Sequence, residues 1–270
     1  MHALLNVAVM AARKAGATLI RKLSNPDKLR IERKGHNDFV SDADHAAEKA
    51  VMDTVLRHYP DHAFLAEESG VVGESDHVWI IDPLDGTTNF LHGFPMFCVS
   101  IGVQVNGRVE HGVVYDPVSQ ELFTASRGQG AQLDGRKIRV SRQTQLDRSL
   151  IGTGFPFRQL DMEMGPYLDM LGKVIRHTAG VRRAGAAALD LAYVAAGRFD
   201  AFWETGLKPW DLAAGGLIIR EAGGIISGLD GGENYLDTGQ VLCGTPKIYA
   251  AIAKLCASEI KAILLKDPNG

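Results

Sequence analysis

The sequence predicts an α/β protein, and three kinds of pattern along the chain indicate it. Apolar residues recur at helical spacing through most of the first 60 residues, and alternating apolar residues separated by turn dipeptides follow to about residue 140. Beyond that point helical and strand patterns alternate, which is typical of layered α/β folds. We expect one unit spanning 1–270, with an N-terminal half at about 1–145 and a C-terminal half at about 146–270.

The N-terminal half is expected to begin with two helices. Apolar residues of segment 1–23 lie on one helical face, and the charges Arg13 and Lys14 follow the apolar run, whereas a signal peptide places its charges first. A second amphipathic helix is expected from about Asp42 to Tyr59, just before Pro60. Each of these helices therefore has an apolar face that we expect to pack against a sheet.

The strands of that sheet follow directly. Two short apolar runs, "AFLA" and "VWII", predict strands that end on acidic residues. Two longer alternating stretches then turn at Asn106-Gly107 and at Asp134-Gly135, dipeptides that favour hairpins. These patterns predict an antiparallel sheet.

The C-terminal half is expected to alternate between strands and helices. The segment 141–148, "SRQTQLDR", is the best boundary before it. The expected elements are a strand in "SLIGTGF", a helix at about 160–176, an alanine-rich helix ending at Gly197, a strand in "FDAFWE", a helix after Pro209 closed by Gly223-Gly224, short strands in "GIISG" and "VLCGT", and a last helix from Pro246 to about Leu265.

The composition excludes several classes of protein. The chain is 46% hydrophobic and 23% charged, which is typical of globular proteins, and its net charge of -3 gives no excess for bulk binding to nucleic acid or a membrane. No apolar run reaches membrane-spanning length. Cys98, Cys243 and Cys256 are too few and scattered for a disulfide framework or a zinc site. We therefore expect a cytoplasmic protein.

The segment "VWIIDPLDG" places two carboxylates where a buried strand ends. Pro83 has no amide hydrogen and fixes one backbone angle, which leaves the carbonyl of Leu84 free to point inward. Asp82, Asp85 and this carbonyl would form a set of oxygen ligands, the kind that Mg²⁺ prefers. The segment therefore indicates a magnesium site.

The residues that follow suit an anion. Gly86, Thr87 and Thr88 would open a helical turn, whose free amides and dipole attract a phosphate. Metal and phosphate could then lie side by side.

Ordinary structural explanations exist for each acid taken alone. Asp-Pro and Asp-Gly are common turn dipeptides, a lone Glu67 is typical of a surface, and Asp211 is typical of a helix N-cap. The number of acids favours a site, because crowded carboxylates repel one another unless a cation compensates them. The acids at expected strand ends or helix starts are Asp44, Glu67, Asp82, Asp85, Glu204 and Asp211.

Several motifs together resemble the inositol monophosphatase family. "DPLDGTTNF" and "WDLAAGGLIIREAGG" are similar to its two signatures, and "AEESG" and "KGHNDFVSDAD" are similar to further family segments. The motifs follow the family's order over about residues 5–260. The segment "RRAGAAALDLAYVAAGRFDAFWETGLKPWD" is most similar to a bacterial branch of that family.

The resemblance implies a five-layer αβαβα sandwich, a homodimer, and hydrolysis of a small phosphate monoester, inositol 1-phosphate, with two or three Mg²⁺ ions. By position, Glu67, Asp82 and the Leu84 carbonyl would hold the first ion. Asp82, Asp85 and Asp211 would hold the second, and Glu67 would also contact a looser third.

The resemblance also implies roles at the substrate. Asp44 and Thr87, with Glu67, would orient the attacking water. Gly86 and Thr87 would receive the phosphate, and Glu204, Arg182 and the Ala187 backbone would face the inositol ring. The residues expected to contact substrate are Asp85, Gly86, Thr87, Arg182, Ala187, Glu204 and Asp211.

Two polar segments near these motifs remain open to more than one interpretation. Lys34 and Asp38 lie in a stretch that predicts a loop beside the site, and a plain surface loop is the alternative. His92 follows the metal motif, but no partner for base catalysis is visible, so a structural role or a place on the rim of the site is favoured.

Other functions remain open. Members of the wider superfamily act on fructose bisphosphate, nucleotides or histidinol phosphate, although the chain has no obvious basic cluster for a second phosphate. From another class, the bacterial branch is associated with transcription antitermination and rRNA processing through the elongation factor NusA. The composition gives no sign of that role, which rests on resemblance alone.

Overall fold

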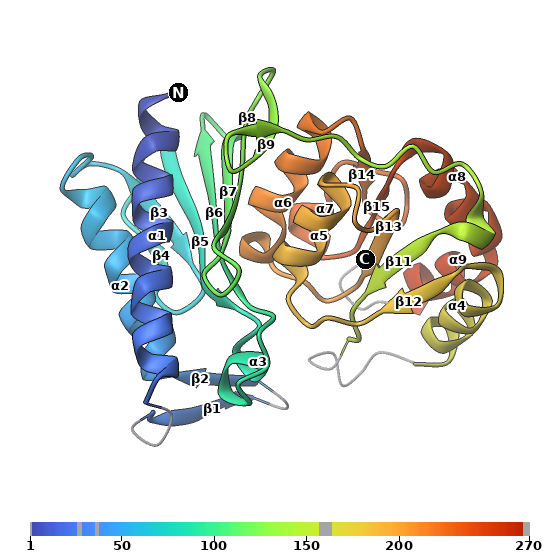
Figure 1. Cartoon of the computed structure of the whole chain (residues 1–270), viewed down its shortest axis with the longest axis horizontal. Coiled ribbons are helices and arrows are strands. Elements are labelled where there is room, and N and C mark those ends of the chain that lie inside the picture. Colours follow the sequence, from blue (N-terminus) through green and yellow to red (C-terminus); the bar gives the residue numbers. More distant parts are fainter. Residues whose placement is uncertain (1, 26–28, 36–37, 157–163, 267–270) are drawn as a thin grey trace.

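The structure, a computed structural model, describes residues 2–25, 29–35, 38–156 and 164–266. In this part of the chain the elements stack in five layers, in the order helix, sheet, helix, sheet, helix (Figure 1). The predicted αβαβα sandwich is therefore confirmed. Helices α1 (Ala3–Leu23) and α2 (Asp42–Leu56) form the outer layer of the N-terminal half.

Helix α1 is a core helix of this fold. Its buried face includes Leu4, Ala8, Ala15 and Leu19, and it packs on the large sheet beside α2. By length and composition alone it could cross a membrane, but half of its most apolar stretch is buried inside the protein. The predicted amphipathic helix is present, and burial against the sheet accounts for its apolar content.

The second layer is a sheet of eight strands in the described residues, in the order β10-β9-β8-β7-β6-β5-β3-β4. The strands are β3 (Ala63–Ala66), β4 (Gly70–Val72), β5 (His77–Asp85), β6 (Cys98–Val105), β7 (Arg108–Asp116), β8 (Glu121–Ser126), β9 (Gly130–Leu133) and β10 (Arg136–Lys137). Neighbours are antiparallel except β3 and β5, which run parallel. This parallel pair brings the carboxyl ends of two strands together at one edge of the sheet.

Both predicted hairpin turns are confirmed. Asn106 and Gly107 link β6 to β7, and Asp134 and Gly135 link β9 to β10, all with positive φ angles between 49° and 77°. Two consecutive residues with positive φ angles form a turn whose twist matches the twist of the antiparallel strands that it joins.

The middle layer contains α5 (Ala187–Ala195) and α6 (Pro209–Glu221), with the short helix α7 (Tyr235–Thr238) beside α6. Helix α6 contacts β6 and β7 of the large sheet and β14 of the small one. Its residues Ala213 and Ala214 face Gly102 and Gly112 of the large sheet, where a Cβ on either glycine would lie under 3 Å from α6. Small residues on both sides therefore let the helix approach the sheet closely.

The fourth layer is a sheet of five strands in the described residues, in the order β12-β11-β13-β15-β14. Its strands are β11 (Leu150–Thr153), β12 (Gly180–Arg182), β13 (Ala201–Glu204), β14 (Ile225–Ser227) and β15 (Val241–Gly244). Helices α4 (Met164–His177), α8 (Pro246–Leu255) and α9 (Ala257–Lys266) cover its outer face (Figure 1). The short turn η2 (Leu146–Arg148) precedes β11 in the predicted boundary segment.

Two expectations about local structure were wrong. The predicted last helix is interrupted at Cys256, where the backbone leaves helical geometry and separates α8 from α9. The described residues of the polar stretch that predicted a loop lie instead in an antiparallel pair of strands, β1 (Ile31–Gly35) and β2 (Asp38–Ser41), with residues 36–37 outside the described part of the chain. The side chains of Lys34 and Asp38 lie outside the described residues, as does the expected start of the helix near residue 160.

One buried histidine makes the fold sensitive to acid. His111 on β7 is 5% exposed, its Nδ1 lies 2.8 Å from the Ser126 hydroxyl, and its ring lies against that of His2. Burial, and then the nearby His2, lower the pKa of His111 from 6.5 to about 4. The unfolded chain therefore binds a proton below pH 6.5 that the folded protein binds only near pH 4.

We expect His111 to contribute stability that is complete above pH 6.5 and is lost as the pH falls toward 4. The loss should reach up to about 3 kcal/mol, since one pKa unit corresponds to about 1.4 kcal/mol. Urea unfolding between pH 7 and pH 4 measures it, and the decline should be shallower in His111→Gln. The exposed His45→Gln serves as control, and parallel declines in all three proteins would contradict the assignment.

Candidate active site

Strand β5 carries two of the predicted metal ligands to the end of the large sheet. Asp82 and Asp85 are three residues apart, so a regular strand would point them to opposite faces. The pairing of β5 with β6 shifts register between these two residues, where Pro83 provides no amide hydrogen. This irregularity allows both carboxylates to face one place.

Asp211 joins them from the other half of the chain. It lies in the first turn of α6, where its Oδ2 accepts a hydrogen bond from the Lys208 amide at 2.7 Å. Carboxylate oxygens of Asp82, Asp85 and Asp211 lie within 4.8 Å of one another, and these residues are 1%, 8% and 5% exposed. Asp211 is therefore not the N-cap residue itself, which is Lys208, but it caps the start of α6 from a position three residues later.

The cluster is electrostatically unfavourable by itself. Burial raises the pKa of Asp82 well above its usual range, and Glu67, Asp85 and Asp211 raise it further. Burial and then Asp211 raise the pKa of Asp85 to about 7. A divalent cation would offset this repulsion, and donors that are all oxygen atoms suit Mg²⁺. The residues present therefore fit the implied metal.

Asp44 and Thr87 form a pair beside the cluster. Asp44 lies in the first turn of α2, and its Oδ2 accepts hydrogen bonds from the Ser41 amide and hydroxyl at 2.8 and 2.7 Å. The Thr87 hydroxyl lies 3.0 Å from Asp44 Oδ1 and 3.1 Å from the Leu84 carbonyl. A hydroxyl has one hydrogen, so Thr87 donates to one of these oxygens at a time and can accept from a third group.

Gly86 is required by its backbone conformation. It has φ of 93°, and a Cβ at this position would lie 2.8 Å from the Met96 carbonyl. Thr87 then begins the short helix α3 (Thr87–Leu91). A side chain at position 86 would therefore displace the turn that carries Thr87.

These groups line a cavity of about 140 Å³ between the two halves of the chain. Glu204 reaches it from the end of β13, next to Gly154, where any Cβ would overlap the Glu204 carboxylate. The predicted residues that line the cavity are Glu67, Asp82, Leu84, Asp85, Gly86, Thr87, Ala187, Glu204 and Asp211. Asp44 contributes through its contact with Thr87.

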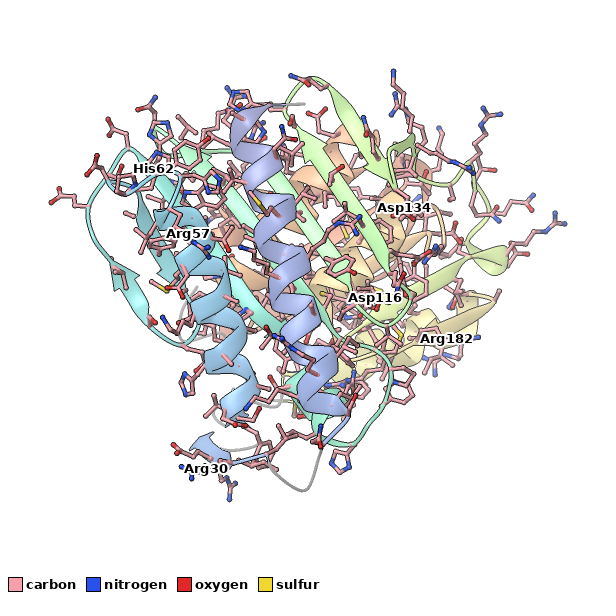
Figure 2. The ribbon with its side chains drawn as sticks, turned by 60° about the vertical axis from the view of Figure 1, so that its left-hand side comes forward. Arg30, Arg57, His62, Asp116, Asp134 and Arg182 are labelled. Atoms are coloured by element: carbon pink, nitrogen blue, oxygen red, sulfur yellow. The ribbon has the colours of Figure 1, made fainter. Side chains whose placement is uncertain are left out.

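Arg182 is placed differently from its neighbour. It ends β12 at the surface, where its guanidinium donates to the Val181 carbonyl at 3.1 Å (Figure 2). Arg183 lines the cavity instead, with its guanidinium over the Phe155 ring. His92 is exposed just after α3 and is not among the residues that line the cavity.

Sequence reasoning missed three buried groups behind the cavity. Glu48 on α2 accepts hydrogen bonds from the Glu68 amide and the Ser69 hydroxyl, directly after Glu67. Cys98 lies against Asp85, and Asp190 on α5 is 1% exposed, with its Oδ1 lacking a hydrogen-bond partner in the described structure. Glu48 lies on the apolar face of its helix, and an acid on that face was the available signal.

The chain belongs to the inositol monophosphatase family, because the family model matches residues 1–261. Within it, the chain is 49% identical over 266 residues to the Nus factor SuhB of Escherichia coli strain K12, covering 98% of this chain and 99% of that protein. It is also 49% identical over 257 residues to the Nus factor SuhB of Pseudomonas aeruginosa, covering 93% and 95%. The resemblance to the bacterial SuhB branch is therefore confirmed.

Solved structures of related proteins are also similar to this chain. The suhB protein of Bartonella henselae is similar with a TM-score of 0.91 and 44% identity, over 94% of this chain and 98% of that one. The IMPase TM1415 of Thermotoga maritima is similar with a TM-score of 0.87 and 32% identity, over 97% and 100%.

The buried carboxylate cluster leads to a prediction about thermal stability that does not depend on catalysis. Asp82→Asn replaces a buried carboxyl group that its acidic neighbours repel by a neutral amide of similar shape, so the melting temperature of the metal-free protein should rise. Native protein should gain about 5–10 °C in Mg²⁺ at about 100 times Kd, and the variant should lose most of that gain. Differential scanning calorimetry in EDTA and in Mg²⁺ measures both effects.

The control for this measurement is Asp116→Asn. Asp116 is also buried, but its carboxylate accepts amide hydrogen bonds in a turn of the large sheet. This variant should lose stability and keep the native gain in Mg²⁺. An undiminished gain in Asp82→Asn would show that this cluster does not bind the ion.

Proposed function

We propose that the protein is a Mg²⁺-dependent phosphomonoesterase of the cytoplasm that hydrolyses inositol 1-phosphate to inositol and phosphate. The observation that carries this proposal is the buried cluster of Asp82, Asp85 and Asp211 on the wall of a polar cavity. Such a cluster is unfavourable without a cation, so it needs a functional reason to exist. A homodimer is proposed from family membership.

The proposed ligands follow from this cluster. Glu67, Asp82 and the Leu84 carbonyl would hold one ion, and Asp82, Asp85 and Asp211 a second, with Glu67 also near a third. When bound, Mg²⁺ supplies positive charge that stabilises the phosphate dianion and makes a water more acidic. No serine or cysteine nucleophile is needed.

The remaining residues position the reactants. Asp44 holds the Thr87 hydroxyl at 3.0 Å, so that this hydroxyl can orient the attacking water, with Glu67 as its partner. The turn at Gly86 and Thr87 supports the phosphate through its amides. Glu204 and the Ala187 backbone are proposed to bind the ring hydroxyls. The exposed Arg182 is proposed to contact the ring only from the rim of the cavity.

Glu204 provides the test of this activity and of its substrate. A site built to bond hydroxyls loses free energy when the partner is removed. Glu204→Ala should therefore lower kcat/KM for inositol 1-phosphate by about 1–3 kcal/mol in transition-state terms, and lower it less for glycerol 2-phosphate. Phosphate release is measured for both substrates.

Further measurements test the metal, the role of Glu204 and the identity of the substrate separately. EDTA should abolish release and Mg²⁺ should restore it, and full activity in EDTA would remove the metal from the mechanism. An equal loss on both substrates would assign Glu204 to the reacting phosphate. A native protein that favours another sugar phosphate, a nucleotide or histidinol phosphate would replace the proposed substrate.

We infer a second role in transcription antitermination and rRNA processing, through contact with NusA. Its support is the name Nus factor SuhB, which relatives 49% identical over nearly the whole chain carry. These names favour the second role more directly than they favour inositol phosphate as substrate. The two roles are compatible, since the carboxylate cluster is buried and a protein partner binds a surface.

Catalysis and partner binding should therefore be separable. Asp85→Asn removes one buried charge and should lower phosphate release about 100-fold or more, because each ~1.4 kcal/mol is tenfold. It should leave the fold and the affinity for NusA unchanged. Circular dichroism and isothermal titration with NusA measure these properties, and a folded variant that loses NusA binding would mean that the two roles share a site.

A further inference from the structure

Cys98 lies directly behind Asp85, and the proposed mechanism does not use it. Its Sγ is 3.6 Å from Oδ2 of Asp85, and the backbone amide of Ala188 is 2.7 Å from the same oxygen. Sulfur forms longer and weaker hydrogen bonds than oxygen, and 3.6 Å is within its range. Oδ2 of this carboxylate therefore accepts from two donors, and the backbone amide of Ala187 also interacts with the Asp85 carboxylate.

The two donors come from different layers of the fold. Cys98 is the first residue of β6 in the large sheet, and Ala188 lies in the first turn of α5 in the middle layer. A carboxylate rotates readily about its last bond, and its two orientations are nearly equivalent when nothing holds them. Two donors fixed in separate elements remove that freedom.

We infer that Cys98 is a positioning residue, which with the Ala188 amide holds Oδ2 of Asp85 and so leaves Oδ1 as the oxygen offered to a cation. The inference rests on the metal site of the proposed function. It concerns the geometry of a ligand and involves no oxidation of the thiol, which is fully buried.

A packing role is the alternative. Cys98 belongs to the apolar cluster between the two sheets, which also contains residues of α5 and α6, and a small residue there fills space in the core. Removing the thiol hydrogen bond and removing the sulfur volume have different consequences, and variants can separate them. Cys98→Ala removes both, while Cys98→Ser keeps a donor and reduces the volume.

Cys243 provides a matched control. It is fully buried in the same apolar cluster, but it lies on β15 of the other sheet, outside the residues that line the cavity. Cys243→Ala therefore removes an equal volume from the same core. It should lower stability without altering a metal ligand.

The experiment is a Mg²⁺ titration of the full-length protein without substrate, by isothermal calorimetry and by the shift in melting temperature. We expect the Kd for Mg²⁺ to rise about three- to tenfold in Cys98→Ala, the effect of one weak hydrogen bond to a charged group. Cys98→Ser should bind within about twofold of native, because its hydroxyl replaces the donor. Cys243→Ala should keep the native Kd.

Each possible result of these titrations supports or overturns the positioning role of Cys98. A native Kd in Cys98→Ala, or a Kd in Cys98→Ser as weak as that in Cys98→Ala, would overturn the positioning role and leave packing. A native protein that does not respond to Mg²⁺ would overturn the proposed metal site itself, and the inference with it. Failure of the inference alone is therefore distinguishable from failure of the proposed function.

Discussion

Repulsion among buried carboxylates is the constraint on which the rest of this structure depends. Asp82 and Asp85 come from the large sheet, while Asp211 comes from a helix more than 120 residues later, and burial raises the pKa of Asp82 and Asp85. Nothing in the cluster itself would hold it together. The packing that surrounds it must therefore supply the free energy that keeps these groups close.

Helix α6 supplies much of that packing. It lies between the two sheets, and almost every residue from Asp211 to Ile219 is buried. On one side of the helix, Ala213 and Ala214 pack closely against Gly102 and Gly112. On the other side, Leu191 packs closely against Gly215. A larger side chain at these contacts would move the helix outward, and Asp211 would leave the cluster with it. The small residues in "DLAAGG" therefore serve the site as well as the core.

Local patterns in the sequence predicted much of this fold. The first two helices, both hairpin turns and α6 are confirmed, because helical periodicity and turn dipeptides are properties of neighbouring residues. The break at Cys256 and the β1–β2 pair were missed. The apolar periodicity continues through the break at Cys256, so the sequence gives no sign of it. The β1–β2 pair consists of polar strands, which lack the alternating apolar pattern that predicts a strand.

The site was predictable only in part for the same reason. The spacing of Asp82 and Asp85 could be interpreted locally. Asp211 was grouped with them only as an acid at an expected helix start, and its assignment to the same metal ion came from the family motifs. The placement of Arg183 in the cavity, with Arg182 at the surface, depends on the path of the chain after β12. Contacts from behind, such as those of Glu48 and Cys98, depend on tertiary packing that periodicity does not describe.

Backbone amides are the common means by which the fold controls these acids. Each of four carboxylates accepts at least one backbone amide. The pairs are Asp44 with Ser41, Asp82 with Leu84, Asp85 with Ala188 and Asp211 with Lys208, at 2.7 to 2.9 Å. An amide lowers the cost of a buried negative charge and restricts the plane of the carboxylate. Because Mg²⁺ requires nearly ideal octahedral geometry, ligands already fixed in this way favour it over larger and more tolerant cations.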